Sequence, residues 1–307
     1  MHHRPFKFIG MVFSLALFSL ALGPEMVRAQ DGLYNSAKSS LAGSMQRADT
    51  MSSGWKNGHK SRVRIISGDT DFSAKSSSYA GVHLQMAKGW KTYWRSPGDA
   101  GVPPTFDWSG STNLKNIRIK WPAPTKYKDE YSTSIGYKHE VILPVEITAK
   151  DKNKPVDIKL RFAYGICADI CVPVEKKLNL TIPTHQSGYK SLLSGYRKMV
   201  PMPVKTTGKI VNGFSIKKIA INLKGKKPSI IIDARIPADT KKAELYVEAS
   251  NGFYLPMPSG EKTSTGNDHR FLIDLTKSDP PKGLVGQTLA LTLIGNKTGI
   301  EYMHKIN

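Results

Sequence analysis

Cysteines, acidic residues and long apolar runs are all scarce in this sequence. Cys167 and Cys171 are the only two cysteines among 307 residues, so no second cysteine cluster can complete a zinc site. The eight histidines are scattered and provide no His-x-x-His pair. Glycine loops that bind phosphate and the Gly-x-Ser-x-Gly motif are also missing, which removes support for nucleotide-binding and hydrolase functions. We expect neither a bound metal nor a cofactor.

Acidic residues are outnumbered by basic ones, 24 to 45, so the formal net charge is +21. Such a charge favours acidic partners, for example nucleic acid, anionic lipid, lipopolysaccharide or an acidic protein. The lysines are dispersed, however, and no arginine-rich arm or aromatic-basic RNA motif occurs. We interpret the charge as a solvated surface that can also steer an acidic partner, and we expect no nucleic-acid partner.

The N-terminus has the three parts of a secretory signal peptide. Basic residues precede an apolar run over residues 8–22, and Val27-Arg28-Ala29 places small residues around a cleavage site. The run is shorter than the roughly 20 residues that span a bilayer, although an uncleaved anchor is the alternative. We predict a signal peptide over residues 1–29, cleavage after Ala29, a periplasmic location and no stable membrane span after cleavage.

The rest of the chain shows the alternation of β-strands and almost no helical periodicity. Residues 30–60 are rich in Ser, Gly, Ala and Lys and predict a loose segment. From residue 61 to 184, short alternating runs separated by turn residues predict an antiparallel β-sandwich. The expected strands are residues 62–66, 80–86, 90–94, 117–121, 141–147, 158–166 and 172–182.

Residues 185–207 interrupt the strand pattern. Residues 189–199 predict one short helix, and the alternating prolines of residues 200–204 predict a stiff, extended linker. Strand-like runs resume in residues 208–307 and predict a second, smaller β domain. The overall expectation is therefore an all-β protein with two domains.

The cysteines lie at the tip of a predicted hairpin. Apolar residues on both sides are even-numbered, whereas the two cysteines are odd-numbered and should lie on the opposite face from the core. A strand, a three-residue tip and a return strand place the cysteines opposite each other, within reach of a disulfide. Pro173 has no N–H to donate, which predicts an edge strand or a bulge there. The apolar residues are Ile158, Leu160, Phe162, Tyr164, Ile166, Val172, Val174, Leu178, Leu180 and Ile182.

Two functions fit a close cysteine pair in an exported protein. A structural disulfide is common in oxidising compartments. A ring of about five residues, however, adds only ~2 kcal/mol of stability, against nearly 5 for a hundred-residue loop. A bond at a hairpin tip is better placed to react, because exchange needs a thiolate to reach a sulfur in line. Both functions stay open on these grounds.

Several motifs, in order along residues 60–185, resemble the N-terminal periplasmic domain of the thiol:disulfide interchange protein DsbD, especially its ScsB-type branch. The resemblance implies an immunoglobulin-like sandwich that relays electrons through its cysteine pair, in electron transport and cytochrome c maturation. The motifs are residues 89–104, Trp121-Pro122-Ala123-Pro124, Gly136-Tyr137, Leu143-Pro144-Val145 and Tyr164-Gly165-Ile166-Cys167.

The resemblance also assigns roles to residues near the pair. It implies that Cys171 forms the mixed disulfide with a partner and that Cys167 resolves it. The family's cap loop corresponds to Lys128-Asp129-Glu130-Tyr131-Ser132, with Tyr131 as the shielding aromatic. The remaining residues around the pair are Tyr93, Asp129, Glu130 and Asp169.

The sequence departs from the best-known members of the family in two ways. Its cysteines are more closely spaced, and it carries no membrane electron conduit or terminal thioredoxin domain. We therefore expect a membrane conduit protein in trans and thioredoxin-like periplasmic partners, with the chain acting as a protein-disulfide reductase-type electron carrier. The alternative is an envelope-binding module with a structural disulfide, in its copper version using Met199 and Met202 with the cysteines.

Overall fold

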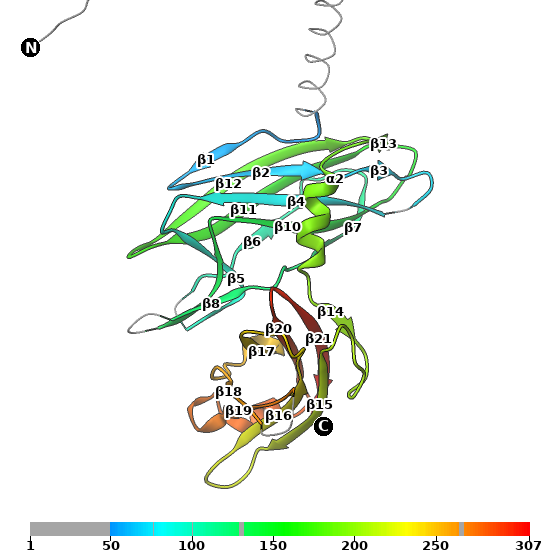
Figure 1. The fold of residues 1–307 in the computed structure, drawn as a ribbon. Helices are drawn as coiled ribbons and strands as arrows, with labels where there is room; N and C mark the ends of the chain where they lie inside the picture. The colour runs from blue at the N-terminus through cyan, green and yellow to red at the C-terminus, as the bar shows by residue number, and fades with distance from the viewer. Residues whose placement is uncertain (1–49, 76, 100, 129–131, 264–266) are drawn as a thin grey trace, which may run out of the picture. The chain divides into compact units, whose positions relative to one another are not determined.

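The computed structural model describes residues 50–75, 77–99, 101–128, 132–263 and 267–307. The predicted signal peptide lies outside these residues. The first part of the described chain contains two antiparallel sheets (Figure 1, blue to green). One has the order β1 (Lys56–Gly58), β2 (Ser61–Ser67), β4 (Ser77–Met86), β10 (Glu140–Ala149), β7 (Leu114–Ile119). The other has the order β12 (Cys171–Ile182), β11 (Val156–Cys167), β5 (Lys91–Gly98), β9 (Thr133–Lys138), β8 (Thr125–Lys128), with β6 (Thr105–Asp107) paired to β11.

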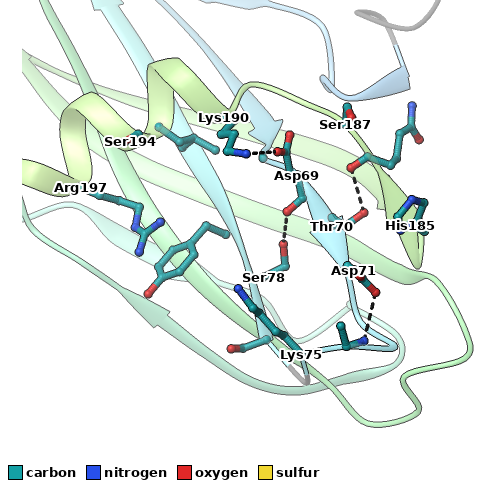
Figure 2. Close-up of a pocket in the computed structure, with 16 residues that line it drawn as sticks. Asp69, Thr70, Asp71, Lys75, Ser78, His185, Ser187, Lys190, Ser194 and Arg197 are labelled. Atoms are coloured by element: carbon teal, nitrogen blue, oxygen red, sulfur yellow. Dashed lines mark hydrogen bonds and ion pairs between the residues drawn. The ribbon is translucent and has the colours of Figure 1, made fainter.

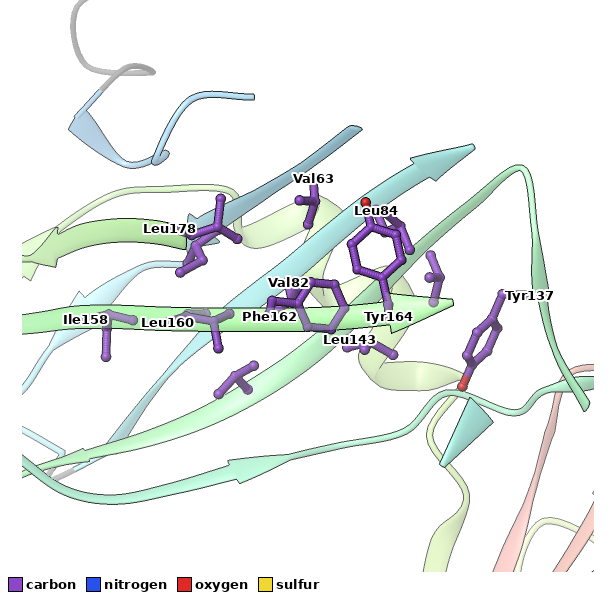
Figure 3. Close-up of a cluster of buried hydrophobic side chains, with 14 of the residues drawn as sticks. Val63, Val82, Leu84, Tyr137, Leu143, Ile158, Leu160, Phe162, Tyr164 and Leu178 are labelled. Atoms are coloured by element: carbon purple, nitrogen blue, oxygen red, sulfur yellow. The ribbon is translucent and has the colours of Figure 1, made fainter. Parts of the chain in front are cut away.

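A hydrophobic core lies between these two sheets, as Figure 3 shows for residues such as Val82, Leu143 and Phe162. The alternation of β11 and β12 supplies one wall of it. Nine of the ten even-numbered apolar residues of this hairpin are buried in the core, and Val172 packs against it half-buried. The predicted register is therefore confirmed. A side-chain period of two lets each strand present one apolar face to the core.

The second part of the chain forms two four-stranded sheets around a core of its own. Among the described residues, no ladder joins its strands to those of the first part. The predicted all-β fold, with a sandwich followed by further β-structure, is confirmed. One sheet has the order β14 (Met202–Val204), β21 (Thr298–Lys305), β20 (Thr288–Gly295), β17 (Ala243–Ala249), and the other β15 (Ser215–Asn222), β16 (Ser229–Arg235), β19 (Asp268–Asp274), β18 (Ser259–Lys262). Short 3₁₀ helices η1 (Ser250–Gly252), η2 (Leu275–Lys277) and η3 (Pro281–Leu284) connect them.

The short helix expected over residues 189–199 is confirmed, but the flanking residues of the expected linker, 185–207, are partly paired in strands. β13 (His185–Gln186) pairs with β3 (Thr70–Asp71), and the helix α2 (Lys190–Lys198) packs Leu193 onto the sandwich. β14 already belongs to the second part, because it pairs in parallel with β21. Local composition cannot reveal these long-range pairings. Met199 still accepts a hydrogen bond from the backbone N–H of Ala123, so only residues 200 and 201 lie between this contact and β14. A division of the chain in this region stays a prediction.

The loose segment expected over residues 30–60 is wrong for its last part, from residue 50. Met51 is buried, and β1 pairs with β2. Trp55 covers the ring of His83, with ring centroids 4.7 Å apart, and His83 is only 2 % exposed. Met51 and Trp55 are therefore enough to anchor this otherwise polar segment on the sandwich, which its average composition does not show.

His83 is held as a neutral imidazole. Arg64 Nε donates to His83 Nδ1 at 3.2 Å, so the ring proton is on Nε2, 2.6 Å from Glu140 Oε1. Burial lowers the pKa of His83, and the nearby Arg64 lowers it further, against the opposing effect of Glu140. An unfolded histidine, with a pKa near 6.5, therefore binds its proton more readily than His83 does in the fold.

Acid should consequently destabilise the fold through His83. Because the folded-state pKa is lowered, this contribution is fully present above pH ~6.5 and is lost progressively as the pH falls from that value through the lowered pKa of the folded state. We expect the free energy of unfolding, measured with urea between pH 7 and 5, to fall less steeply in His83→Gln than in the parent chain. His59→Gln, at an exposed histidine, is the control, and equal slopes for all three proteins would contradict the prediction.

The contact between β5 and β9 depends on Gly136, because a methyl group there would overlap the carbonyl oxygen of Thr92. Gly136→Ala should destabilise the fold by about 1–3 kcal/mol. Gly195→Ala is the matched control: nothing lies near that position on α2, and alanine should stabilise the helix by about 0.5–1 kcal/mol. Urea unfolding measures both changes, and equal effects at the two glycines would refute the reasoning.

Candidate functional site

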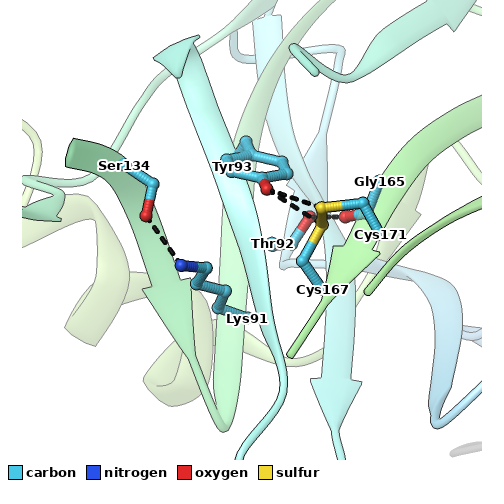
Figure 4. The surroundings of a disulfide bond; sticks show 7 residues. All are labelled: Lys91, Thr92, Tyr93, Ser134, Gly165, Cys167 and Cys171. Atoms are coloured by element: carbon cyan, nitrogen blue, oxygen red, sulfur yellow. Dashed lines mark hydrogen bonds between the residues drawn. A yellow bond between two sulfur atoms is a disulfide. The ribbon is translucent and has the colours of Figure 1, made fainter. Parts of the chain in front are cut away.

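The site is the tip of the β11–β12 hairpin, where the two cysteines form a disulfide (Figure 4). Cys167 ends β11, Cys171 begins β12, and the two are direct partners in the ladder with Cα atoms 4.2 Å apart. The backbone N–H of Ala168 donates to the carbonyl of Ile170 within the three-residue tip, at 3.1 Å. β12 is an edge strand of its sheet, as Pro173 predicted.

The two sulfur-bearing residues differ in their access to solvent. Cys171 is exposed, whereas Cys167 is 0 % exposed. Both lie off the core face, as expected, but Cys167 is covered by β5, where it pairs with Lys91. The sequence therefore predicted the face of both cysteines but not the burial of Cys167. An attacking thiolate must approach a disulfide along the S–S axis, and the solvent side leads it to Cys171.

Tyr93 contacts both sulfurs. Its hydroxyl donates to Cys167 Sγ at 2.9 Å and lies 3.1 Å from Cys171 Sγ. Its ring is buried against Gly165, where a Cβ would be 3.2 Å from the ring, and a Cβ at Gly101 would overlap it. Small residues on two sides therefore make room for an aromatic ring directly against the disulfide.

Neighbouring residues of β5 fix the strand that carries Tyr93. The Thr92 hydroxyl donates to the Gly165 carbonyl at 2.8 Å, which ties β5 to β11. Lys91 Nζ donates to Ser134 Oγ at 2.8 Å, which ties β5 to β9 (Figure 4). These bonds hold the strand in the position that brings the tyrosine hydroxyl against both sulfurs.

An apolar groove of about 410 Å³ adjoins Cys171. Val102, on its rim, is 57 % exposed, and Ile170, at the neighbouring hairpin tip, is 65 % exposed. Exposed apolar residues beside a reactive group are typical of surfaces that bind another protein. Sequence reasoning missed this groove, although Val102 and Pro103 lie inside a motif that carried the family resemblance. Besides Val102 and Cys171, it is lined by Pro103, Thr105, Ala163, Tyr164, Gly165, Val172, Pro173, Val174 and Glu175.

Comparison with known proteins agrees with this geometry. Residues 62–183 match a family model described as "Thiol:disulfide interchange protein DsbD, N-terminal". This segment therefore resembles the N-terminal domain of DsbD. It contains the whole disulfide hairpin and Tyr93, and it ends one residue after β12.

A solved structure extends the likeness beyond that domain. The crystal structure of the N-terminal periplasmic domain of ScsB from Proteus mirabilis matches with a TM-score of 0.62 and 19 % sequence identity. The match covers 84 % of this chain and 99 % of that one, so it continues past residue 183 into the second set of sheets. At this identity the match shows the fold alone. No curated protein sequence matches the chain.

The other predicted site residues have different outcomes. Asp169 is exposed in the hairpin tip, next to the pair. The predicted cap residues Asp129, Glu130 and Tyr131 lie outside the described residues, so their role stays a prediction. Strands β8 and β9, which flank them in sequence, belong to the same sheet as β5 and β11.

Within the described ranges no group of three or more His, Cys, Asp or Glu side chains could hold a metal ion. Of the methionines in the copper hypothesis, Met202 lies in β14, where its sulfur accepts a hydrogen bond from Asn212 Nδ2 at 3.3 Å. No helix in the described part of the chain is long and apolar enough to span a bilayer.

A second cavity, of about 540 Å³, lies at β3, β13 and α2 (Figure 2). Cys171 begins β12, whereas β13 follows the other end of that strand, at Ile182. The cavity therefore lies about eleven residues along β12 from the disulfide. Its lining is polar, and Lys190 and Asp69 form an ion pair across it at 3.1 Å. The cavity is therefore separate from the disulfide site.

Removing the Tyr93 hydroxyl should slow opening of the disulfide. A hydrogen bond to a charged group contributes about 1.5–3 kcal/mol, and the bond to Cys167 would stabilise this sulfur as it leaves as a thiolate. We expect the rate of reduction by dithiothreitol to be lower in Tyr93→Phe than in the parent chain, by a factor of about ten or more. Tyr189→Phe removes a hydroxyl that lies near Arg64 instead and should react at the parent rate. An unchanged rate of reduction in Tyr93→Phe would show that the tyrosine hydroxyl takes no part in opening the disulfide.

Proposed function

We propose that the chain is an exported thiol–disulfide exchange protein that carries electrons through Cys167 and Cys171 to or from thioredoxin-like partners in the periplasm. The observation that carries the proposal is the asymmetry of the disulfide, in which one sulfur belongs to an exposed residue and the other to a buried one beneath a tyrosine hydroxyl. The match to the DsbD N-terminal family supports it.

The asymmetry assigns a role to each sulfur. A partner thiolate attacks Cys171 Sγ, the bond between the two cysteines breaks, and Cys167 leaves as a thiolate that accepts the Tyr93 hydrogen bond. The partner's second thiolate then attacks the partner sulfur of the mixed disulfide and releases the Cys171 thiolate. Two electrons have moved to the pair, and the partner has become a disulfide.

The reverse sequence passes the electrons on. The Cys171 thiolate attacks the disulfide of an oxidised partner and forms a mixed disulfide, which releases one partner sulfur as a thiolate. Cys167, as a thiolate, then attacks Cys171 Sγ and releases the second partner sulfur. The pair ends as a disulfide and the partner as a dithiol. A membrane conduit protein in trans is our candidate for the source of electrons.

A binding module with an inert disulfide is the competing function, and the small ring is the observation that counts against it. The bond joins neighbouring residues of one hairpin and crosses no other part of the fold. By the chain-entropy relation it adds only ~2 kcal/mol, so stability alone is a weak reason to have it.

Single-cysteine variants test the assigned roles. Reduced Cys167→Ser leaves the exposed Cys171, and it should accumulate a mixed disulfide when mixed with an oxidised thioredoxin-fold protein, visible on a non-reducing gel. Reduced Cys171→Ser leaves the buried Cys167 and should trap at least about tenfold less, because access limits exchange. The double variant is the control for non-specific association. Equal trapping by the two single variants, or more by Cys171→Ser, would contradict the assignment.

A further inference from the structure

Strand β5 loses its partner directly after Tyr93. Its ladder with β9 joins Tyr93 to Gly136 and resumes only at Gly98, which pairs with Ser134. Residues 94–97 lie in this irregular stretch. Sheet pairing therefore fixes the strand up to the tyrosine but leaves the next residues to be held by something else.

The strands of the second part of the chain provide that support, within the single compact unit formed by residues 48–307. Trp94 is 1 % exposed and packs on Tyr246 of β17, with ring centroids 5.4 Å apart. Arg95 Nε and Nη2 lie 2.9 and 2.7 Å from Glu248 Oε2, also on β17. Arg95 Nη2 also donates to Glu301 of β21.

These contacts form a fork-shaped ion pair in a partly buried place. The Arg95 side chain is 26 % exposed and that of Glu248 21 %. Burial lowers the pKa of Arg95, but the two carboxylates outweigh that effect and raise the pKa above its usual value. The planar guanidinium fixes direction as well as distance, because its N–H groups have a fixed geometry.

We infer that Glu248 and Glu301, acting through Arg95, position Tyr93 against the disulfide, so that the second set of sheets is a working part of the redox site. The inference rests on the proposed exchange function and adds two positioning residues to it. Tyr93 and Arg95 are two residues apart, and a hydrogen bond weakens steeply when its donor moves by several tenths of an ångström or turns away. Release of Arg95 therefore frees the chain on one side of Tyr93 and weakens the hydrogen bond from its hydroxyl, while Thr92 and Lys91 still hold the other side.

The test measures the rate at which dithiothreitol reduces the disulfide of the full-length chain, in the parent background and in a Tyr93→Phe background. The variant Glu248→Gln/Glu301→Gln keeps the shape of both side chains and removes both charges. We expect it to be reduced about three- to tenfold more slowly than the parent, since part of a hydrogen bond to a charged group is lost. In a Tyr93→Phe background the same two substitutions should change the rate by less than about twofold, because coupled residues are not additive.

Asp233→Asn is the matched control. It breaks another fork-shaped pair, between Asp233 and Arg270 on β16 and β19, which touches neither β5 nor the disulfide. It should leave the rate of reduction unchanged in both backgrounds, although it also removes a carboxylate from the second set of sheets. Circular dichroism confirms that each variant is folded. If the double variant does not fold, Arg95→Lys replaces it, since lysine keeps the charge and loses the fork.

The outcomes separate this inference from the proposed function. A parent chain that resists dithiothreitol would refute the exchange function itself. A parent that reacts, with a double variant or Arg95→Lys variant that reacts equally fast, would refute the inference alone. Equal slowing with Tyr93 and with Phe at position 93 would also overturn it, because the effect would then not pass through the tyrosine.

Discussion

The register of β11 against β12 is the constraint on which the site depends. Because side chains alternate across a strand, one register sends the even-numbered apolar residues into the core and both cysteines to the other face. The same register makes Cys167 and Cys171 direct partners in the ladder, which brings the two sulfurs together. A shift by one residue would bury the cysteines in the core and expose residues such as Phe162 and Leu178. The free energy of burying the core residues therefore fixes the position of the two cysteines.

Strand β5 turns this symmetric pair into an asymmetric one. It covers Cys167 but not Cys171, and it brings the Tyr93 hydroxyl to both sulfurs. The next two residues, Trp94 and Arg95, contact the second set of sheets. Three consecutive side chains thus link the disulfide to strands that lie about 150–200 residues later in the chain.

Local patterns in the sequence predicted those strands whose position follows from the alternation of their own side chains. Alternation located β2, β4, β10, β11 and β12, and the parity of the cysteines predicted their face. Burial of Cys167 was not predictable, because its ladder partner Lys91 and the contacting Tyr93 belong to a strand more than 70 residues earlier in the chain. The ordered structure of residues 50–60 depends on the packing of Trp55 against His83. The position of β14 depends on its pairing with β21. These are pairings between distant segments, which no local composition encodes.

The central claim is that the disulfide exchanges reversibly, and its reduction potential tests this most directly. The chain is equilibrated with glutathione buffers of known potential, and the fraction of free thiol is measured by alkylation and mass spectrometry. We predict a midpoint above about −300 mV, in the range where periplasmic carriers can reduce and reoxidise the pair. A midpoint well below about −300 mV would show a bond that resists physiological reduction, as structural disulfides do, and would contradict the exchange function.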